Sequence, residues 1–175
     1  MRRCEKLLLS IYERKKLGTA LYVFSALSSM LIALVFLAYI FYLTVFVKDY
    51  KEALRLVLTA GFPFLMVGFA RKIIGAKRPY EVYPFYEECP KRRFFGKMQK
   101  DEGGASFPSR HAYSAFVVAS AAVFICVPVG VAIAFVAVLM CACRVLLGIH
   151  FIRDVLAGAI IGVLAGVLGE FLLRF

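Results

Sequence analysis

The chain has 175 residues, of which 62% are hydrophobic and 19% charged, and its mean hydropathy is +0.82. A composition this apolar excludes an ordinary soluble domain and predicts that most of the chain lies in a membrane. The formal net charge of +11 is compatible with nucleic-acid binding, but the basic residues cluster at the edges of apolar runs and in one loop. Anionic lipid headgroups are the nearer partners there, so we expect a lipid bilayer and no nucleic acid as the partner.

The first half of the chain predicts one interfacial helix and two membrane spans. Residues 1–17 are basic, and their apolar core is too short for a secretory signal, so they predict a basic N-terminal interfacial helix. Residues 18–47 carry no charge and are long enough to cross a hydrocarbon core of roughly 30 Å with tilt. Residues 56–70 form a second uncharged run, flanked by Arg55 and Arg71, whose side chains we expect to snorkel to the interface.

The second half predicts three further spans, which follow a long polar connection at residues 76–106 that we expect to serve as an active-site loop. Residues 112–143 are uncharged but are interrupted by Val-Pro-Val-Gly at 127–130, which predicts a tight turn between two spans. Residues 155–169 form the last span, where three glycines at four-residue spacing predict close helix packing. The five cysteines show neither metal-ligand spacing nor a disulfide framework. We therefore predict an all-α fold, a single membrane domain over residues 1–175 with about five transmembrane helices.

Charged and polar side chains collect in three clusters at the ends of these spans, where such groups are costly and usually functional. The clusters are Arg71, Lys72, Lys77 and Arg78; Ser109, Arg110 and His111; and Arg144, His150, Arg153 and Asp154. With five spans, the second span ends, the third begins, the fourth ends and the fifth begins on the same side of the membrane. All three clusters are therefore expected at one membrane surface, and both histidines of the chain lie in them.

The histidines indicate acid–base or nucleophilic chemistry. His150 and Asp154 are four residues apart, so on a helix they share a face. An aspartate that accepts a hydrogen bond from one imidazole nitrogen leaves the other nitrogen available as a nucleophile or base. His111 can then supply a proton to a leaving oxygen.

The same surface offers donors for an anion. Arg78 and Arg144 can bind an oxyanion through paired N–H donors. Ser109 and the backbone amides near Pro108 lie at a helix N-terminus, which favours phosphate. Arginines, amides and two histidines around one anion suit phosphoryl transfer through a phosphohistidine. No carboxylate cluster indicates a required metal ion, so we expect neither a metal nor a cofactor.

The three clusters resemble the motifs of the type 2 phosphatidic acid phosphatase superfamily, which also includes the vanadium haloperoxidases. The family pattern consists of K-x6-R-P, P-S-G-H and S-R-x5-H-x3-D. The corresponding residues here, in the same order and at fitting separations, are Arg71-x6-Arg78-Pro79, Pro108-Ser109-Arg110-His111 and Cys143-Arg144-x5-His150-x3-Asp154. The resemblance covers roughly residues 65–165.

This resemblance implies a role for each matching residue. His150 would be the nucleophile, Asp154 its orienting partner and His111 the general acid. The residues implied to hold the phosphate are Arg71, Arg78, Ser109 and Arg144. The implied activity is metal-independent and acts on a membrane lipid phosphate or diphosphate, such as phosphatidic acid, phosphatidylglycerol phosphate or an isoprenyl diphosphate.

Three positions depart from the family pattern. Arg71 stands where the family has lysine, and Lys72 lies one residue out of register, so either could bind the phosphate. Arg110 replaces glycine and adds a cation, which could contact phosphate and favour a diphosphate, or could narrow access. Cys143 replaces serine and removes a good hydrogen-bond donor. The implied nucleophile, its partner and the acid are all retained, so we expect an active enzyme.

The sequence leaves open two alternatives and the membrane side. A phosphotransferase would use an alcohol in place of water, and a non-catalytic lipid-phosphate binding or transport protein would keep the same fold. We expect a multi-pass protein of the cell membrane. All but four of the 22 Lys and Arg residues are expected on the side of the site, which the positive-inside rule assigns to the cytoplasm. The family resemblance implies the outer side instead. The sequence indicates no oligomeric state.

Overall fold

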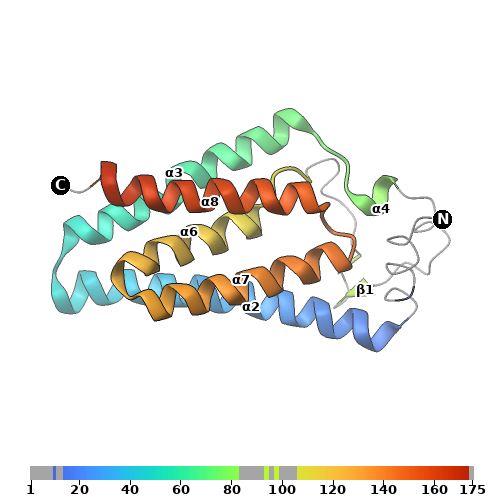
Figure 1. Cartoon of the computed structure of the whole chain (residues 1–175), viewed down its shortest axis with the longest axis horizontal. Helices are drawn as coiled ribbons and strands as arrows, with labels where there is room; N and C mark the ends of the chain where they lie inside the picture. The colour runs from blue at the N-terminus through green and yellow to red at the C-terminus, as the bar shows by residue number, and fades with distance from the viewer. Residues whose placement is uncertain (1–9, 11–13, 83–92, 95–96, 99–105, 174–175) are drawn as a thin grey trace.

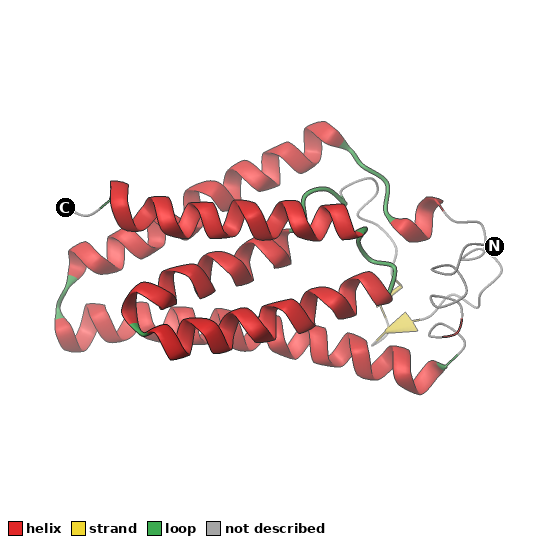
Figure 2. Ribbon diagram, in the orientation of Figure 1, coloured by secondary structure: helices red, strands yellow, loops and turns green. Residues whose placement is uncertain are grey.

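The computed structural model of the chain describes residues 10, 14–82, 93–94, 97–98 and 106–173. This described part is a bundle of long helices that run along a common direction (Figure 1, Figure 2). The long helices are α2 (Lys15–Tyr42), α3 (Tyr50–Ile74), α6 (Arg110–Ile125), α7 (Val127–Leu146) and α8 (Ile152–Leu172). Four of them are long and apolar enough to cross a membrane, and α6 is a shorter apolar helix of 16 residues. The prediction of an all-α polytopic membrane bundle is confirmed.

The other described elements are short. They are the π-helix η1 (Leu43–Val47), the helix α4 (Pro79–Val82) and the antiparallel strands β1 (Arg93–Phe94) and β2 (Lys97–Met98). The last three belong to the connection at 76–106, for which no regular element was predicted. Most of that predicted active-site loop, and most of the predicted interfacial helix at 1–17, lie outside the described residues.

Helices α2 and α3 form a hairpin. Helix α3 is longer than the predicted span at 56–70, whereas α2 ends at Tyr42 and η1 continues the predicted span at 18–47 to Val47. The end of α2 widens into η1, which is followed by Lys48 in the left-handed region at φ 60°. Asp49 then caps α3, because its carboxylate accepts a hydrogen bond from Glu52 N at 3.0 Å. Helix α3 ends at Gly75, which has a φ of 56°. Glycine adopts this left-handed conformation without strain because it has no Cβ. The two helices diverge from their turn as a V that opens toward the end of the bundle where α4 lies (Figure 1).

The prediction that Arg55 and Arg71 snorkel to the membrane interface is wrong, because both are buried. Arg55 forms ion pairs with Glu52 on its own helix and with Glu170 near the end of α8. A charge that is paired in this way can stay inside the bundle, so α3 continues through Arg55 and begins at Tyr50. The ion pairs tie α3 to α8 at the end of the bundle opposite Arg71.

The turn between α6 and α7 is shorter than predicted, because Cys126 alone separates the two helices. Pro128 lies in the first turn of α7, where its missing N–H removes no intrahelical hydrogen bond. Gly130 packs against the last turns of α6 so closely that a Cβ would lie 2.5 Å from Val123 N. The segment predicted as a turn is therefore the start of a helix.

Helix α6 is central in the bundle, and its most extensive contact is with α8. A Cβ at Gly158 would lie 2.4 Å from Ser109 O, and a Cβ at Gly162 would lie 2.5 Å from Tyr113 O. Only a residue without a side chain allows these backbones to approach so closely. The prediction that these glycines, together with Gly166, serve close helix packing is confirmed.

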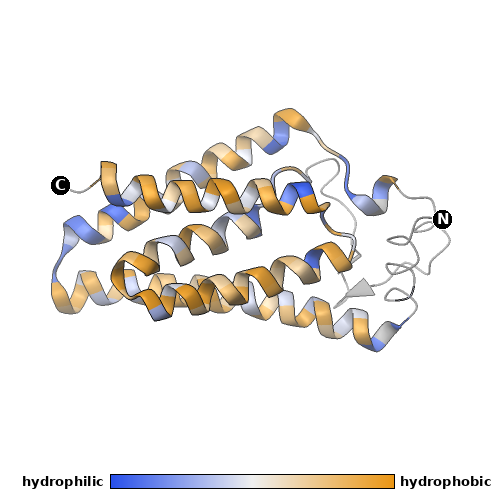
Figure 3. Ribbon diagram, in the orientation of Figure 1, coloured by the Kyte–Doolittle hydropathy of each residue, from blue (hydrophilic) through white to orange (hydrophobic). Residues whose placement is uncertain are grey.

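Apolar side chains occupy both the core and the outer surface of the bundle. Tyr113, Val117 and Met140 are among the largest fully buried side chains, and many large apolar side chains, such as Leu37 and Phe69, are exposed. Figure 3 shows that hydrophilic residues gather toward the helix ends. An apolar surface with polar ends is expected of a chain that crosses a membrane several times.

Candidate active site

The three polar clusters meet at one end of the bundle, where α3 and α7 end and α6 and α8 begin (Figure 1). Direct contacts join them. Arg71 of α3 donates from Nη1 to the carbonyl oxygen of Pro108 at 2.8 Å. The backbone N–H of Ser109 donates to the carbonyl oxygen of Asp154 at 2.9 Å. The structure thus brings together the residues that span counting places at one surface.

A chain of hydrogen bonds connects His150 to Asp154 through Ser106. Ser106 Oγ donates to Asp154 Oδ2 at 2.5 Å and lies 3.3 Å from His150 Nδ1. All three residues are buried. Because the serine proton is directed at the carboxylate, the serine oxygen accepts from His150 Nδ1–H. This tautomer leaves the lone pair on His150 Nε2.

His150 and Asp154 do not share a helix face, contrary to the prediction from their spacing. Gly148 has a φ of 67° after the end of α7, and α8 begins only at Ile152, so His150 lies in the connection between the helices. His150 Nδ1 is 3.7 Å from Asp154 Oδ2, which is longer than a hydrogen bond. The carboxylate therefore orients the imidazole mainly through Ser106.

Asp154 is held rigidly at the start of α8. Its side chain is 0% exposed, and Oδ2 also accepts a hydrogen bond from Phe151 N at 3.0 Å. Oδ1 makes no hydrogen bond with the described residues and lies 3.6 Å from Arg153 Nε. A carboxylate in the first turn of a helix is stabilised by the helix dipole, so this position suits an ionised aspartate.

The pKa of His150 is lower than its ordinary value of 6.5. Burial is the main cause, because it disfavours the charged imidazolium, and Arg78 and Arg144 lower the pKa further. Asp154 opposes this shift. The imidazole is therefore neutral at neutral pH, which is the form that a nucleophile or base requires.

The start of α6 presents backbone amides toward the site. Ser109 is the N-cap of this helix, since its Oγ accepts a hydrogen bond from Ala112 N at 3.4 Å, and its side chain is 0% exposed. Its hydroxyl is thus engaged in the cap. The N–H groups of Arg110 and His111, in the first turn, are the ones that a helix N-terminus offers to an anion.

Three arginines converge on the site. Arg71 is buried against Pro108, whereas the neighbouring Lys72 is exposed. Arg78 and Arg144 are half-buried, and the charges of Arg71 and Arg78 both act on Arg144. Like charges brought together in this way repel one another, and a bound anion would relieve the repulsion.

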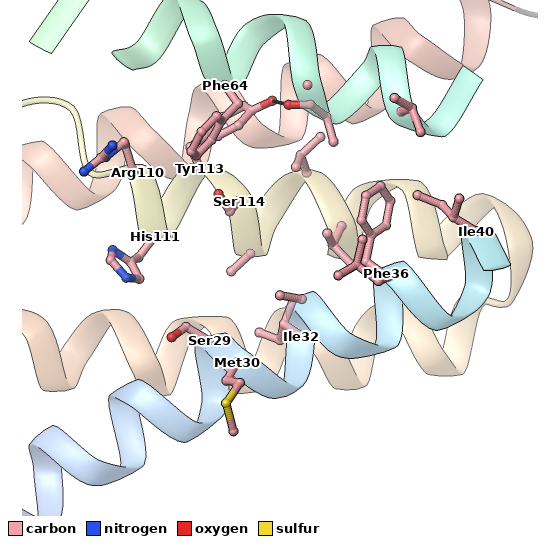
Figure 4. Close-up of a pocket in the computed structure, with 18 residues that line it drawn as sticks. Ser29, Met30, Ile32, Phe36, Ile40, Phe64, Arg110, His111, Tyr113 and Ser114 are labelled. Carbon is pink, nitrogen blue, oxygen red and sulfur yellow. Dashed lines mark hydrogen bonds between the residues drawn. The ribbon is translucent and has the colours of Figure 1, made fainter. Parts of the chain in front are cut away.

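His111 and Arg110 leave the first turn of α6 on opposite sides (Figure 4). His111 points toward α2 and is exposed, while Arg110 lies on the side of α3 and is half-buried. His150 and Arg144 both act electrostatically on His111. One exposed and one buried histidine thus lie at the same anion-attracting site.

Sequence reasoning missed Ser106. This residue lies outside the predicted spans, at the end of the long polar connection, and no periodicity marks it. The only signal is indirect, because Ser106 lies three residues before the predicted helix N-cap at Ser109. Its two partners are 44 and 48 residues away along the chain, so only the folded structure shows what it contacts.

The described residues contain no group of three or more His, Cys, Asp or Glu side chains that could hold a metal ion. The described cysteines Cys126, Cys141 and Cys143 are free, and the last two are buried. What this part of the chain offers to a ligand is cationic: arginine guanidinium groups and the start of α6. The site is suited to an anion.

Comparison with known proteins identifies the family. The model of the PAP2 superfamily matches residues 52–169, which is more than half of the chain and includes all three clusters. No curated protein and no solved structure matches the chain significantly. Members of this superfamily are in general phosphatases, which supports a phosphoester hydrolase. The match and the meeting of the three motifs at one anion-attracting site show that the chain belongs to the PAP2 superfamily.

Proposed function

We propose that the protein is a metal-independent phosphatase of the cell membrane that hydrolyses a lipid phosphate or an isoprenyl diphosphate through a phosphohistidine. The observation that carries this proposal is the hydrogen-bonded chain from His150 through Ser106 to Asp154. It keeps a proton on Nδ1 and a lone pair on Nε2, which is the form that can attack phosphorus. The lowered pKa of His150 also supports it, because the imidazole is neutral at neutral pH.

In the first step, His150 Nε2 attacks the phosphorus atom and forms a P–N bond, while the bond between phosphorus and the lipid oxygen breaks. His111 donates its proton to the departing oxygen, so the lipid leaves as an alcohol, or as a monophosphate when the substrate is a diphosphate. The imidazole gains positive charge in this step. Ser106 and Asp154 stabilise that charge through Nδ1–H.

In the second step, a water molecule attacks the phosphorus atom, and His111, now neutral, accepts its proton. The P–N bond breaks, inorganic phosphate leaves, and the lone pair returns to His150 Nε2. An alcohol in place of water would give phosphotransfer with the same residues.

We assign the phosphate oxygens to Arg71, Arg78, Arg144 and the amides at the start of α6. Guanidinium groups bind such oxygens in pairs and would neutralise the charge that spreads over them in the transition state. The burial of Arg71 favours it over the exposed Lys72. Ser109 would act through the cap of α6, and the Arg110 side chain would contact a second phosphate group.

The test is phosphate release by the detergent-purified protein in EDTA. Phosphatidic acid, phosphatidylglycerol phosphate and an isoprenyl diphosphate would be offered to the wild type and to the His150→Ala and Lys72→Ala variants. We expect release in EDTA that is abolished by His150→Ala and retained by Lys72→Ala. Acid-labile labelling of the protein by radioactive substrate, absent in His150→Ala, would identify the phosphohistidine.

Two outcomes would overturn the proposal. Release that EDTA abolishes would contradict the metal-independent mechanism. Folded wild-type protein that binds these lipids but releases no phosphate would favour the binding or transport function, because that function needs the anion site but no proton transfer.

A further inference from the structure

A cavity of about 700 Å³ lies between α2, α3 and α6 and reaches the candidate active site (Figure 4). It occupies the V between α2 and α3, and α6 forms its back. Tyr113 holds α6 against α3 on one side of the cavity. Its OH donates to Ala60 O at 2.7 Å, and its ring centroid lies 6.4 Å from that of Phe64. Met30 and Val57 also line the cavity and are exposed, so the cavity is open toward the surrounding membrane.

The cavity is polar at one end and apolar along the rest of its length. Ser29, Arg110, His111 and Ser114 line the end next to the site, whereas aliphatic and aromatic side chains line the remainder (Figure 4). Along α2 the lining extends from Ser29 to Ile40, which at 1.5 Å per residue is about 16 Å. This is about half of a hydrocarbon core of roughly 30 Å. The cavity therefore has the depth of one leaflet, with the proton donor at its polar end.

Phe36 lies in the apolar part of this cavity, away from His111 (Figure 4). Phe36 and Val118 also line a second, smaller cavity of about 110 Å³, which extends to Cys126 and Val129 at the other end of α6. The second cavity is lined almost entirely by apolar side chains. The Phe36 ring thus stands between a space of one-leaflet depth and a further apolar space behind it.

We propose that the large cavity holds the hydrocarbon chain of the lipid phosphate and that Phe36 limits the length of chain it accepts. This inference rests on the function proposed above, because the phosphate of the same molecule would lie between His150 and the arginines. The occupant is a substrate chain rather than a protein segment, because the cavity is continuous with His111, which would protonate the oxygen that carries the chain. The opening between α2 and α3 allows that chain to enter sideways from the bilayer.

The cavity selects among hydrocarbon chains by how well their length fits its shape. A chain that leaves the bilayer for this cavity exchanges one apolar environment for another, so its transfer contributes almost no hydrophobic free energy. A chain that fits holds the phosphorus near His150, and one that must push Phe36 aside loses binding contacts in a close-packed interior. The length preference should therefore change when the cavity is shortened or extended.

Two positions allow opposite changes of the cavity. Gly61 lines it, and a Cβ there would meet no atom within 4 Å, so we expect a leucine side chain at this position to extend into the cavity and fill part of it. Phe36→Ala would connect the large cavity to the smaller one, and Phe36→Leu would do so in part. Gly68→Leu is the matched control, since Gly68 lies on the same helix, has equally open space at Cβ and does not line the cavity.

The experiment measures kcat/KM for a series of n-alkyl phosphates, from butyl to docosyl, in mixed detergent micelles. Butyl phosphate is too short to fill the cavity and reports the chemistry alone. We expect Gly61→Leu to lower kcat/KM for hexadecyl phosphate about tenfold, with butyl phosphate and the Gly68→Leu variant unchanged. We expect Phe36→Ala to shift the preferred length toward longer chains, and Phe36→Leu to shift it less.

The outcomes separate this inference from the proposed function. Suppose that Gly61→Leu and both Phe36 variants hydrolyse the series with the same dependence of kcat/KM on chain length as the wild type. That result would overturn the inference and leave the phosphatase proposal intact. If the wild type hydrolyses none of the series, the phosphatase proposal is decided by release from the three lipids of the EDTA assay, and a hexadecyl phosphate with a photoreactive terminal carbon tests the cavity by itself. Labelling around Phe36 would support the inference, and labels scattered over the exposed apolar surface would contradict it.

Discussion

Replacing Ser106 by alanine is the sharpest test of the site, because this hydroxyl lies between the proposed nucleophile and its carboxylate. The change removes the 2.5 Å hydrogen bond to Asp154 Oδ2 and the 3.3 Å contact with His150 Nδ1. It leaves the imidazole 3.7 Å from the carboxylate. A hydrogen bond to a charged group contributes about 1.5–3 kcal/mol. The imidazole gains charge in the transition state, so losing this stabilisation there lowers the rate by about 10- to 150-fold.

The assay is kcat/KM for butyl phosphate, measured across pH. We expect Ser106→Ala to show this loss and to move the acid limb to lower pH, because Asp154 raises the pKa of His150 less when the link through Ser106 is gone. Ser106→Cys, which keeps a weak donor, should be intermediate. Ser25→Ala is the control, since the Ser25 hydroxyl is buried and makes no hydrogen bond with the described residues.

A Ser106→Ala protein that is folded and has the wild-type rate and pH profile would refute this reasoning. Asp154 would then orient His150 directly, and the hydroxyl would have no part in the reaction. An equal loss in Ser25→Ala would also refute it, because the effect would come from any change of a buried serine.

Three further predictions concern pH, packing and buried charge. The acid limb of the wild-type kcat/KM profile should lie below pH 6.5, because the pKa of His150 lies below that value and protonation removes its lone pair. Gly158→Ala should lower the thermal unfolding temperature in detergent and slow catalysis, because its Cβ would lie 2.4 Å from Ser109 O and displace the start of α6. We expect the free energy of unfolding to fall by about 1–3 kcal/mol. Arg55→Met should destabilise the fold by about 3–5 kcal/mol, because it removes the guanidinium that forms a buried ion pair with Glu170.

Each of these predictions has a result that would contradict it. An acid limb above pH 6.5 would mean that another group controls the rate. A Gly158→Ala protein with wild-type stability would show that α6 and α8 can separate at no cost. For Arg55→Met, the folded fraction should keep its turnover of butyl phosphate, since Arg55 lies at the end of the bundle opposite the site, and lost turnover would contradict a purely structural role.

Helix boundaries show where local sequence ceases to be informative. The apolar run at 56–70 predicted a span that begins only after Arg55, because an isolated charge is costly in a membrane. The structure continues α3 through Arg55, since Glu170 neutralises it from 115 residues away. Likewise, Pro128 and Gly130 read as turn residues in sequence, but one occupies a first helical turn and the other a close helix contact.

The choice between Arg71 and Lys72 illustrates the same limit at the site. Adjacent helical residues differ by about 100° in direction, and the sequence alone did not indicate which one points inward. In the structure Arg71 is buried against Pro108 and Lys72 is exposed. The packing of α3 in the bundle decides this orientation.

The sequence by itself determined the class of the protein, the membrane helices, and the meeting of the three polar clusters at one surface. Hydropathy is a local property of the chain, and the side on which a helix ends follows from the number of spans before it. Only the tertiary structure decided that Ser106 links His150 to Asp154, that Arg71 points inward and that an apolar cavity leads from His111 to Phe36. These features depend on distances between residues far apart in the chain, which are set by how the helices pack.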